Sequence, residues 1–480
     1  MEDYWQNYID GAFVDGSAGR IDIEDPGTGQ KIAEQALADA ADVDRAVTAA
    51  QRVHESGALS DLRPVERGRM VRRMGDTLLK HIDEIASLLT QESGKPLWEA
   101  RIEIEGAARY FEYYSNQAET VEGRSIPLGA GYFDFTVHEP YGVSAQIIPW
   151  NYPLEMTARS LSAALACGNA CVIKTPELDP LSSRYIAHAA EEAGLPPGAV
   201  NILCGLGPEA GAALSAHPGI DQIVFTGSVP TGIAIARAAA GNVVPCVLEL
   251  GGKSAAIVFD DADIDAFMND VRWGIYFNAG QVCSAMSRVI AHEAIHDRLV
   301  DGVVALAEGL SVGPGIERPE FGANMGAMIS EKQRDRAGGM VVEAQREGAT
   351  VATGGRKMNQ PGWFLEPTVL TAVDQRMTIA REEVFGPVLS VLKVSSEEEA
   401  ITAANATPYG LVGGVFTRDL DRATRAARRM RAGQIFVNEW YAGGVETPFG
   451  GYGHSGYGRE KGREALWNYV QTKNIAIKLG

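Results

Sequence analysis

Three residues with reactive side chains stand in short segments where they could act together. Cys283 lies in the glycine-containing segment FNAGQVCSAMSR, unlike the other four cysteines, which occur in apolar stretches. Glu249 ends the apolar run VLEL before two glycines, and Asn151 follows IIPW on a proline-bounded turn. A thiolate can attack a carbonyl carbon, an amide N–H can hold the resulting oxyanion, and a carboxylate can activate water. These residues therefore predict covalent catalysis at a thiol.

Further polar residues follow apolar segments of the same kind. The segment VIKTPE places Lys174 and Glu177 after a strand-like run, and VFTGS places Gly227 and Ser228 before a predicted helix. Over residues 141–250, apolar runs alternate with helical segments, which predicts a parallel sheet covered by helices on both faces. Ligands of such sheets bind beyond the carboxyl ends of the strands. We therefore expect these polar residues and the three reactive ones to form one site.

The rest of the chain predicts the elements around that sheet. The stretch YIDGAFVDG predicts a small hairpin, and residues 64–119 look mostly helical. A second block of strands and helices is expected over about 250–440. Residues 121–140 carry turn residues and little helical period, which indicates an extended excursion, and the C-terminal tail ends in an alternating, strand-like run.

A competing motif is the stretch AHEAIHDRL, which contains the pattern H-E-x-x-H. On a helix this spacing can bind zinc through two histidines, with the glutamate as general base. Here SRVIA predicts a strand up to His292, and His296 starts the next helix, so the two rings would not share a helical turn. No further Cys/His cluster follows as a third ligand. We interpret the stretch as a strand–helix junction and keep a zinc peptidase as the less favoured alternative.

Composition narrows the class of protein. The chain has 480 residues, enough for two or three domains, and a net charge of −19 without a long Lys/Arg run, so a nucleic-acid partner is not expected. No apolar run is long enough to span a membrane, and the N-terminus lacks the pattern of a signal peptide. Five cysteines do not make a disulfide framework. We expect a cytoplasmic protein without membrane or nucleic-acid partners and without a bound metal.

The motifs, taken in order, resemble the NAD(P)-dependent aldehyde dehydrogenase superfamily over nearly the whole chain. They are YIDGAFVD, PWNYP, KTPE, FTGS, LELGGK, GQVCS, EEVFGPV, PFGGYGHSGYGRE and VQTKNI. The segment GQVCSAMSR also resembles the betaine-aldehyde branch of that family.

The resemblance implies a role for each reactive residue. Cys283 would attack an aldehyde as a thiolate, and the oxyanion would be held by the Asn151 amide and the backbone N–H of Cys283. Hydride transfer to the nicotinamide would leave a thioester, and Glu249 would activate the water that releases the acid.

The resemblance also implies a set of NAD-binding residues. Lys174 and Glu177 would hold the adenosine ribose, and the turn Gly227–Ser228 the pyrophosphate. Glu383 would hold the nicotinamide ribose, Phe385 would pack against that end of the cofactor, and Trp150 would line its cleft. Because the Glu177 carboxylate would repel a 2′-phosphate, we predict that NAD is preferred over NADP.

The implied fold is α/β with three parts. Residues 1–120 and 141–250 would form the NAD-binding domain, and residues 251–450 the catalytic domain. Residues 121–140 and 465–480 would form a small β oligomerisation element of a homodimer or homotetramer.

The aldehyde itself stays open among aromatic or aliphatic aldehydes, betaine-type aldehydes and semialdehydes. Aromatic side chains would suit a quaternary ammonium group through cation–π contacts. Arg159 would favour a carboxylated semialdehyde, although Glu155, four residues earlier on the same helix, could neutralise it. The predicted tunnel residues are Tyr152, Glu155, Arg159, Trp273, Tyr276, Phe277, Trp440, Tyr441 and Phe449.

An alternative keeps the fold and the thiol but not the oxidation, giving a thiol esterase or an acylating enzyme. Glu249 and the cofactor motifs favour oxidation to the free acid. Activity that disappears without NAD would exclude the alternative.

We predict that the purified protein reduces NAD with an aldehyde, that turnover requires Cys283, and that a chelator has no effect. Thiolate chemistry needs no metal, whereas a zinc peptidase loses activity with its metal. The measurement follows reduced nicotinamide with betaine aldehyde, succinic semialdehyde, benzaldehyde and hexanal, each repeated with Cys283→Ala and with the chelator. Activity abolished by the chelator alone would contradict the thiol mechanism.

Overall fold

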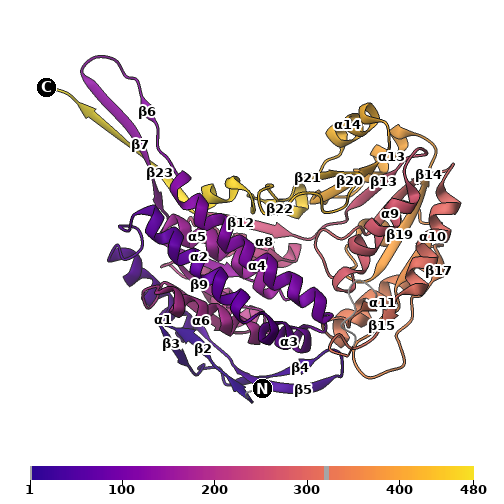
Figure 1. Ribbon diagram of the computed structural model, residues 1–480, viewed down its shortest axis with the longest axis horizontal. Helices are drawn as coiled ribbons and strands as arrows, with labels where there is room; N and C mark the ends of the chain where they lie inside the picture. Colours follow the sequence, from indigo (N-terminus) through magenta and orange to yellow (C-terminus); the bar gives the residue numbers. More distant parts are fainter. Residues whose placement is uncertain (1–2, 318–323) are drawn as a thin grey trace.

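Two helix-covered sheets and a projecting β-arm make up the chain (Figure 1). The computed structural model describes residues 3–317 and 324–480. Residues 1–2, at the start of the predicted NAD-binding domain, and residues 318–323, inside the predicted catalytic domain, lie outside the described residues. Both large sheets contain mainly parallel strands, so the expected α/β class is confirmed. The predicted domain boundaries stay a prediction.

The first sheet has eight strands in the order β22-β12-β11-β8-β9-β10-β2-β3. The strands from β12 to β10 are parallel, and β22 and β2 join the two ends antiparallel. β8, β9 and β10 are buried along their whole length, as expected for parallel strands covered on both faces, and β8 also buries Ser144 and Gln146 between its apolar residues. The predicted hairpin is confirmed as β2 paired with β3. The strands are β2 (Asn7–Ile9), β3 (Ala12–Val14), β8 (Val143–Ile147), β9 (Ala170–Thr175), β10 (Val200–Cys204), β11 (Gln222–Gly227), β12 (Cys246–Leu250) and β22 (Gly456–Tyr457).

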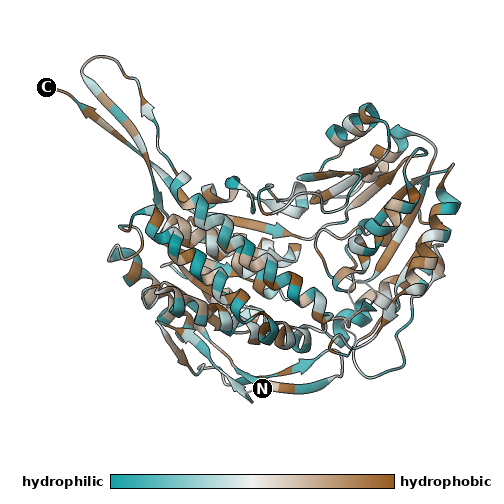
Figure 2. Cartoon of the chain, viewed as in Figure 1, coloured by the Kyte–Doolittle hydropathy of each residue, from teal (hydrophilic) through white to brown (hydrophobic). Residues whose placement is uncertain are grey.

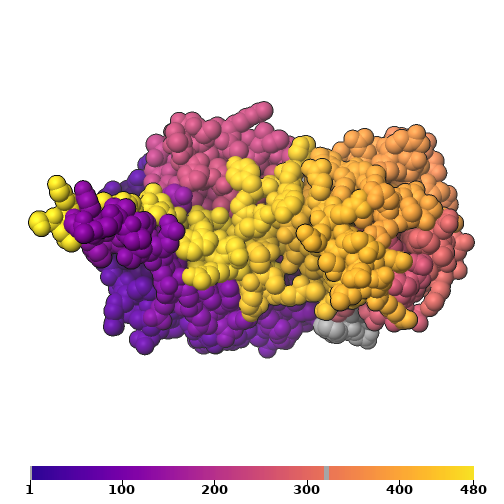
Figure 3. Space-filling model, turned by 90° about the horizontal axis from the view of Figure 1, so that it is seen from above, coloured from indigo at the N-terminus to yellow at the C-terminus, as the bar shows by residue number. Residues whose placement is uncertain are grey.

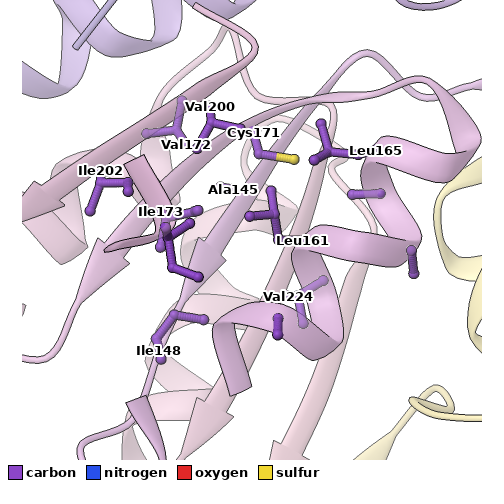
Figure 4. Packing of buried hydrophobic residues seen from close by; sticks show 14 of the residues in the cluster. Ala145, Ile148, Leu161, Leu165, Cys171, Val172, Ile173, Val200, Ile202 and Val224 are labelled. Atoms are coloured by element: carbon purple, nitrogen blue, oxygen red, sulfur yellow. The ribbon is translucent and has the colours of Figure 1, made fainter. Parts of the chain in front are cut away.

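Helices on this sheet bury its apolar side chains. Figure 4 shows Leu161 and Leu165 of α5 packed near Ala145 and Cys171, and Cys171 is a fully buried core residue. The helix α5 ends where Gly168 adopts a left-handed conformation, with φ of 95°. The helices are α1 (Ala40–Glu55), α2 (Pro64–Lys80), α3 (Ile82–Ser93), α4 (Leu97–Gln117), α5 (Pro153–Cys167), α6 (Arg184–Ala193), α7 (Ala212–Ala216) and α8 (Val229–Ala240).

The second sheet has seven strands in the order β17-β18-β19-β14-β13-β20-β21 and its own buried core. All neighbouring strands are parallel except β17, which pairs antiparallel with β18. The strands are β13 (Ala255–Val258), β14 (Arg288–His292), β17 (Thr350–Thr353), β18 (Thr368–Thr371), β19 (Val388–Val394), β20 (Val412–Phe416) and β21 (Gln434–Val437). The helices are α9 (Ile264–Val271), α10 (His296–Gly309), α11 (Glu331–Arg346), α12 (Thr378–Arg381), α13 (Glu397–Ala404) and α14 (Leu420–Arg429).

The arm joins two segments that are far apart in the sequence. The strand β7 (Tyr132–Pro140) pairs antiparallel with β6 (Ser125–Ile126) on one side and with β23 (Val470–Lys478) on the other. Both the expected excursion and the strand-like tail are therefore part of one three-stranded sheet, and apolar residues lie along it although it projects from the body (Figure 2). Before reaching the arm, the C-terminal segment runs across the surface between the two sheet-bearing parts (Figure 3).

The remaining elements are short. A three-stranded sheet and a strand pair contain β1 (Tyr4–Trp5), β4 (Arg20–Asp25), β5 (Gln30–Ala36), β15 (Ser311–Val312) and β16 (Asn324–Met325). Single helical turns are η1 (Ala118–Thr120), η2 (Leu181–Ser183), η3 (Gly207–Gly211), η4 (Arg272–Tyr276), η5 (Phe277–Gly280), η6 (Gly453–Ser455) and η7 (Arg463–Asn468). Within residues 3–317 and 324–480, every helix is too short or too polar to cross a membrane.

A buried arginine ties the second sheet to its flanking segments. Arg288, the first residue of β14, is only 1% exposed, and its guanidinium donates to backbone carbonyls. The distances are 3.0 and 2.8 Å to Lys253 O, 2.9 Å to Ala403 O and 2.9 Å to Ala404 O. Arg288 therefore joins the segment before β13 to the end of α13 across the start of β14.

We predict that Arg288→Met lowers the free energy of unfolding by about 2–4 kcal/mol. The methionine keeps an apolar stem but leaves several buried carbonyls without a donor. The measurement is the midpoint of urea unfolding, with Arg346→Met as the control because the Arg346 side chain is 73% exposed. An unchanged midpoint for Arg288→Met would show that these carbonyls find other donors.

Candidate active site

The ends of three neighbouring parallel strands, β8, β11 and β12, bring Asn151 and Glu249 to one edge of the first sheet, and Cys283 faces them from the loop before β14. Thr226 of β11 lies opposite Glu249 of β12, and Phe225 lies opposite Ile147, the last residue of β8. A cavity of about 940 Å³ opens at this edge. Asn151, Glu249 and Cys283 all line this cavity. The structure therefore brings together three residues that lie up to 132 positions apart in the sequence.

Cys283 stands on a constrained loop between η5 and β14. Asn278, Ala279 and Gly280 have φ angles of 47°, 50° and 71°, a left-handed region that only glycine enters without cost. The loop is held from outside, because the backbone N–H of Asn278 donates to Glu99 Oε2 at 2.9 Å. Its side-chain amide donates to the carbonyl of Asn151, also at 2.9 Å.

Asn151 is fixed by hydrogen bonds at both ends. Its side-chain N–H donates to the carbonyl of Gln281 at 3.0 Å, two residues before Cys283. Its own carbonyl accepts from Lys95 Nζ at 2.9 Å as well as from Asn278. Among the described residues, the second N–H of the Asn151 amide has no acceptor, which leaves it available to an oxyanion at Cys283.

The support behind Asn151 was missed by the sequence analysis. Lys95 forms a buried ion pair with Glu103 of α4, and Glu103 Oε1 accepts from the backbone N–H of Leu154 at 3.0 Å. This carboxylate therefore holds the first turn of α5, where an N-terminus favours negative charge. A charged residue within a long helical stretch carries no local signal of such a role, since most charged helix positions face solvent.

Burial shifts the pKa values of Glu249 and Cys283. Glu249 is 2% exposed, and among the described residues neither of its carboxylate oxygens has a hydrogen-bond partner. Burial raises the pKa of Glu249 well above its ordinary value, with Arg159 opposing the shift and Glu460 adding to it. Burial also raises the pKa of the Cys283 thiol to about 12. Burial therefore favours the protonated form of both groups.

The residues predicted for the nicotinamide end and the pyrophosphate of the cofactor line the same cavity: Trp150, Gly227, Ser228, Glu383 and Phe385. The Trp150 and Phe385 rings meet edge to face, 5.2 Å apart, and Ser228 caps α8, whose exposed N-terminal N–H groups favour a phosphate. Glu383 Oε1 accepts from the backbone N–H of Gly252 at 2.9 Å, and burial raises the pKa of Glu383 to about 7.

The glycine before α8 keeps this part of the cavity open. A Cβ at Gly227 would lie 2.5 Å from the Phe225 ring, so a larger residue would not fit there. The close backbone approach and the capped helix terminus together fit a dinucleotide cofactor.

Lys174 and Glu177 do not line the cavity. They lie at the end of β9, where Lys174 Nζ contacts Glu177 Oε2 at 3.1 Å and donates to the Thr175 carbonyl at 2.8 Å. Because β9 neighbours β8, with Lys174 opposite Ile147, this pair extends the same sheet edge beyond the cavity. Their predicted ribose contact stays a prediction.

Several predicted tunnel residues line the cavity, and three do not. Those that line it are Tyr152, Glu155, Arg159, Phe277, Tyr441 and Phe449. The prediction was wrong for Trp440, whose indole N–H donates to Ser284 O at 3.3 Å while its ring packs on Phe436 in the core. It was also wrong for Trp273, which packs edge to face on Trp98, and for Tyr276, which is buried in the core. Periodicity could not tell these aromatic side chains from cavity-lining ones.

The charge of Arg159 is compensated by Glu460 and not by Glu155, the residue that the sequence indicated. Its guanidinium forms a buried ion pair with Glu460 rather than with Glu155, and it donates to Thr226 Oγ1 at 3.0 Å. Helical spacing indicated Glu155, but the tertiary fold places Glu460, from the segment after β22, against Arg159. Other lining residues that the sequence analysis missed are Ile102, Tyr110, Met156, Val282, Phe436 and Lys461.

The H-E-x-x-H stretch lies away from this cavity and does not form one helical turn. The strand β14 ends at His292 and α10 begins at His296, as the junction interpretation expected. Within the described part of the chain, no group of three or more His, Cys, Asp or Glu residues could hold a metal ion.

Such a cavity suits an enzyme that forms a covalent bond to its cysteine next to an anionic cofactor. The chain belongs to the aldehyde dehydrogenase family, whose profile matches residues 13–475. It is therefore an NAD(P)-dependent oxidoreductase that acts on aldehydes.

Relatives cover almost the whole chain. Over 477 residues it is 43% identical to the mitochondrial aldehyde dehydrogenase family 2 member B4 of Arabidopsis thaliana, with 99% of this chain and 88% of the relative covered. The NAD⁺ complex of aldehyde dehydrogenase from Bacillus cereus is 39% identical, with a TM-score of 0.97 over 99% of this chain and 97% of that chain. Betaine aldehyde dehydrogenase from Staphylococcus aureus, also solved with NAD⁺, is 36% identical, with a TM-score of 0.96 over 98% of this chain and 94% of that chain. The predicted family is confirmed.

We predict that alkylation of Cys283 by iodoacetamide accelerates about tenfold per pH unit between about pH 7 and pH 9, because only the thiolate reacts and its pKa lies higher. Peptide mapping by mass spectrometry measures the rate at each cysteine. The buried Cys167, Cys171 and Cys204 serve as internal controls and should stay unmodified in the folded protein. A rate at Cys283 that does not change over this range would mean that the thiolate is already formed at pH 7.

Proposed function

We propose that this chain oxidises an aldehyde to the carboxylic acid with NAD through a covalent adduct on Cys283. The observation that supports this most strongly is the meeting of Cys283, the free amide N–H of Asn151 and the buried Glu249 in one cavity. The same cavity continues to the N-terminus of α8, where a dinucleotide fits.

In the proposed first step, Cys283 Sγ bonds to the aldehyde carbon and the thiol proton leaves to a base. The carbonyl oxygen becomes an oxyanion that accepts from the Asn151 side chain and the Cys283 backbone N–H. NAD, when bound in the cleft, accepts the hydride whose departure turns the adduct into a thioester.

In the second step, Glu249 acts as the general base. It takes a proton from a water molecule as the water oxygen bonds to the thioester carbon. The C–S bond then breaks, the carboxylic acid leaves and the Cys283 sulfur regains a proton. The raised pKa of Glu249 suits this role once its carboxyl is ionised, because a carboxylate with a higher proton affinity is a stronger base.

For the cofactor, we propose that Trp150, Phe385 and Glu383 hold the nicotinamide end and that Ser228 and the α8 N-terminus hold the pyrophosphate. Lys174 and Glu177, further along the sheet edge, would hold the adenosine ribose. The ion pair between Lys174 and Glu177 supports a fixed carboxylate there, which favours the ribose of NAD over the 2′-phosphate of NADP.

We further propose a homodimer or homotetramer joined through the arm. β23 is an edge strand of the arm sheet, and an unpaired edge can pair with another chain. Large apolar side chains on the arm are about half exposed, which supports a covering surface from a second copy. They are Leu128, Tyr132, Phe133, Ile477 and Leu479.

We predict that Glu249→Gln gives a burst of about one reduced nicotinamide per active site, followed by steady turnover that is slower by about 10²–10⁴-fold. The adduct and the thioester can still form, but glutamine cannot take a proton from water. Rapid-mixing absorbance of reduced nicotinamide measures both phases.

Two variants bracket this result. Cys283→Ala should give neither burst nor turnover, and Glu343→Gln, at a half-exposed ion pair on α11, should behave like the wild type. Unchanged steady turnover in Glu249→Gln would remove Glu249 from the hydrolytic step.

A further inference from the structure

Tyr110, Glu155 and Lys461 are among the polar side chains of the cavity lining that have no protein partner in the described part of the chain. They come from different elements: Tyr110 from α4, Glu155 from α5 and Lys461 from the segment after β22. Among the described residues, none of these side chains has a hydrogen-bonding or ion-pairing partner, whereas Arg159 beside them is paired with Glu460. Lys461 is therefore the uncompensated positive charge of this group.

The three groups are close enough to interact electrostatically. Glu155 acts on both Tyr110 and Lys461, and Cys283 acts on Lys461. The Glu155 carboxyl lies against α4 at a glycine, since a Cβ at Gly106 would be only 3.3 Å from Glu155 Cδ. Tyr110 follows one helical turn after Gly106, on the same side of α4.

Lys461 has an unusual backbone conformation. Its φ of 64° lies in the left-handed region, which a lysine enters only when the surrounding structure requires it. The ammonium lies 5.7 Å from the centre of the Phe449 ring, within the cavity wall. The side chain is partly buried, so its charge is only weakly compensated by water.

The Glu155 carboxyl compensates this charge only in part at neutral pH. Burial raises the pKa of Glu155 to about 7, and the nearby Glu103 raises it further, while Lys461 opposes the shift. A large fraction of Glu155 is then a neutral acid, which can donate a hydrogen bond.

Two of the aromatic rings in the cavity lining already face protein cations. Lys95 Nζ lies 4.6 Å from the Tyr152 ring centre. The Phe449 ring faces both Lys461 and the Arg159 guanidinium, whose distance is 5.8 Å. A quaternary ammonium group at either of these two rings would meet a protein cation.

We infer that Lys461 and Tyr110 form a carboxylate-binding subsite, so that the substrate is an aldehyde carrying a carboxylate at its far end. The Lys461 ammonium pairs with this carboxylate, and the Tyr110 hydroxyl donates to it. The aldehyde group lies at Cys283, which lines the same cavity. The inference rests on the proposed oxidation and names its substrate class as the semialdehydes of dicarboxylic acids.

The test compares glutarate semialdehyde with pentanal, which has the same chain length and no charge. With NAD, the wild type should show a kcat/KM at least about tenfold higher for the semialdehyde. In Lys461→Met this ratio should fall by about 10- to 100-fold, and in Tyr110→Phe by a smaller factor, because each removes a donor to a charged group. Lys461→Arg should keep most of the ratio.

The matched control is Lys393→Met, which removes an exposed lysine of β19 and should leave the ratio unchanged. A wild type that prefers pentanal or betaine aldehyde, or a ratio that Lys461→Met does not alter, would overturn the subsite.

A binding measurement separates this inference from the proposed oxidation. Calorimetry with glutarate, a dicarboxylate that cannot be oxidised at an aldehyde, should show binding to the wild type and at least about tenfold weaker binding to Lys461→Met. Glutarate binding that depends on Lys461, without oxidation of any aldehyde, would support the subsite and overturn the proposed function. Oxidation of pentanal without glutarate binding would support the proposed function and overturn the subsite.

Discussion

The site depends on one buried hydrogen bond between the two sheet-bearing parts of the chain. The Asn151 side chain, carried by the turn after β8, donates to the carbonyl of Gln281, on the loop that leads to Cys283 and β14. The thiol belongs to one part, and the amide and Glu249 belong to the other. Lys95 and the Asn278 side chain, which both donate to the Asn151 carbonyl, support this contact and help to hold the reactive groups together.

Exclusion of water from the site changes the pKa values of its reactive groups. Glu249 and Cys283 are ordinary side chains, but burial raises the pKa of both, since a charge in a low-dielectric site is unfavourable. The charges nearby act in opposite directions on Glu249, with Arg159 favouring its ionised form and Glu460 its neutral form. Because Arg159 is paired with Glu460, its positive charge near the reaction centre is compensated. The charge of Lys461 is not compensated in this way and stays available to a ligand.

Local patterns predicted some elements well and others poorly. The hairpin β2–β3 and the buried parallel strands are specified by short-range signals, namely turn residues and continuous apolar runs. The same kind of signal rejected the zinc motif, because SRVIA indicated a strand ending where the motif begins. Trp273 and Trp440 were misplaced, since an aromatic residue next to a predicted site can face either the cavity or the core, and both face other aromatic rings.

The sequence by itself determined the class of fold, the reactive residues that line the cavity and the family. Each of these is encoded in short contiguous motifs, whose conformation depends mainly on neighbouring residues. Tertiary structure alone decided which charges are compensated. Arg159 meets Glu460, 301 positions away, rather than its helical neighbour, and Lys461 meets no carboxylate within ion-pairing distance among the described residues. An ion pair depends on the distance between atoms in space, and that distance is fixed only when α4, α5 and the segment after β22 pack together.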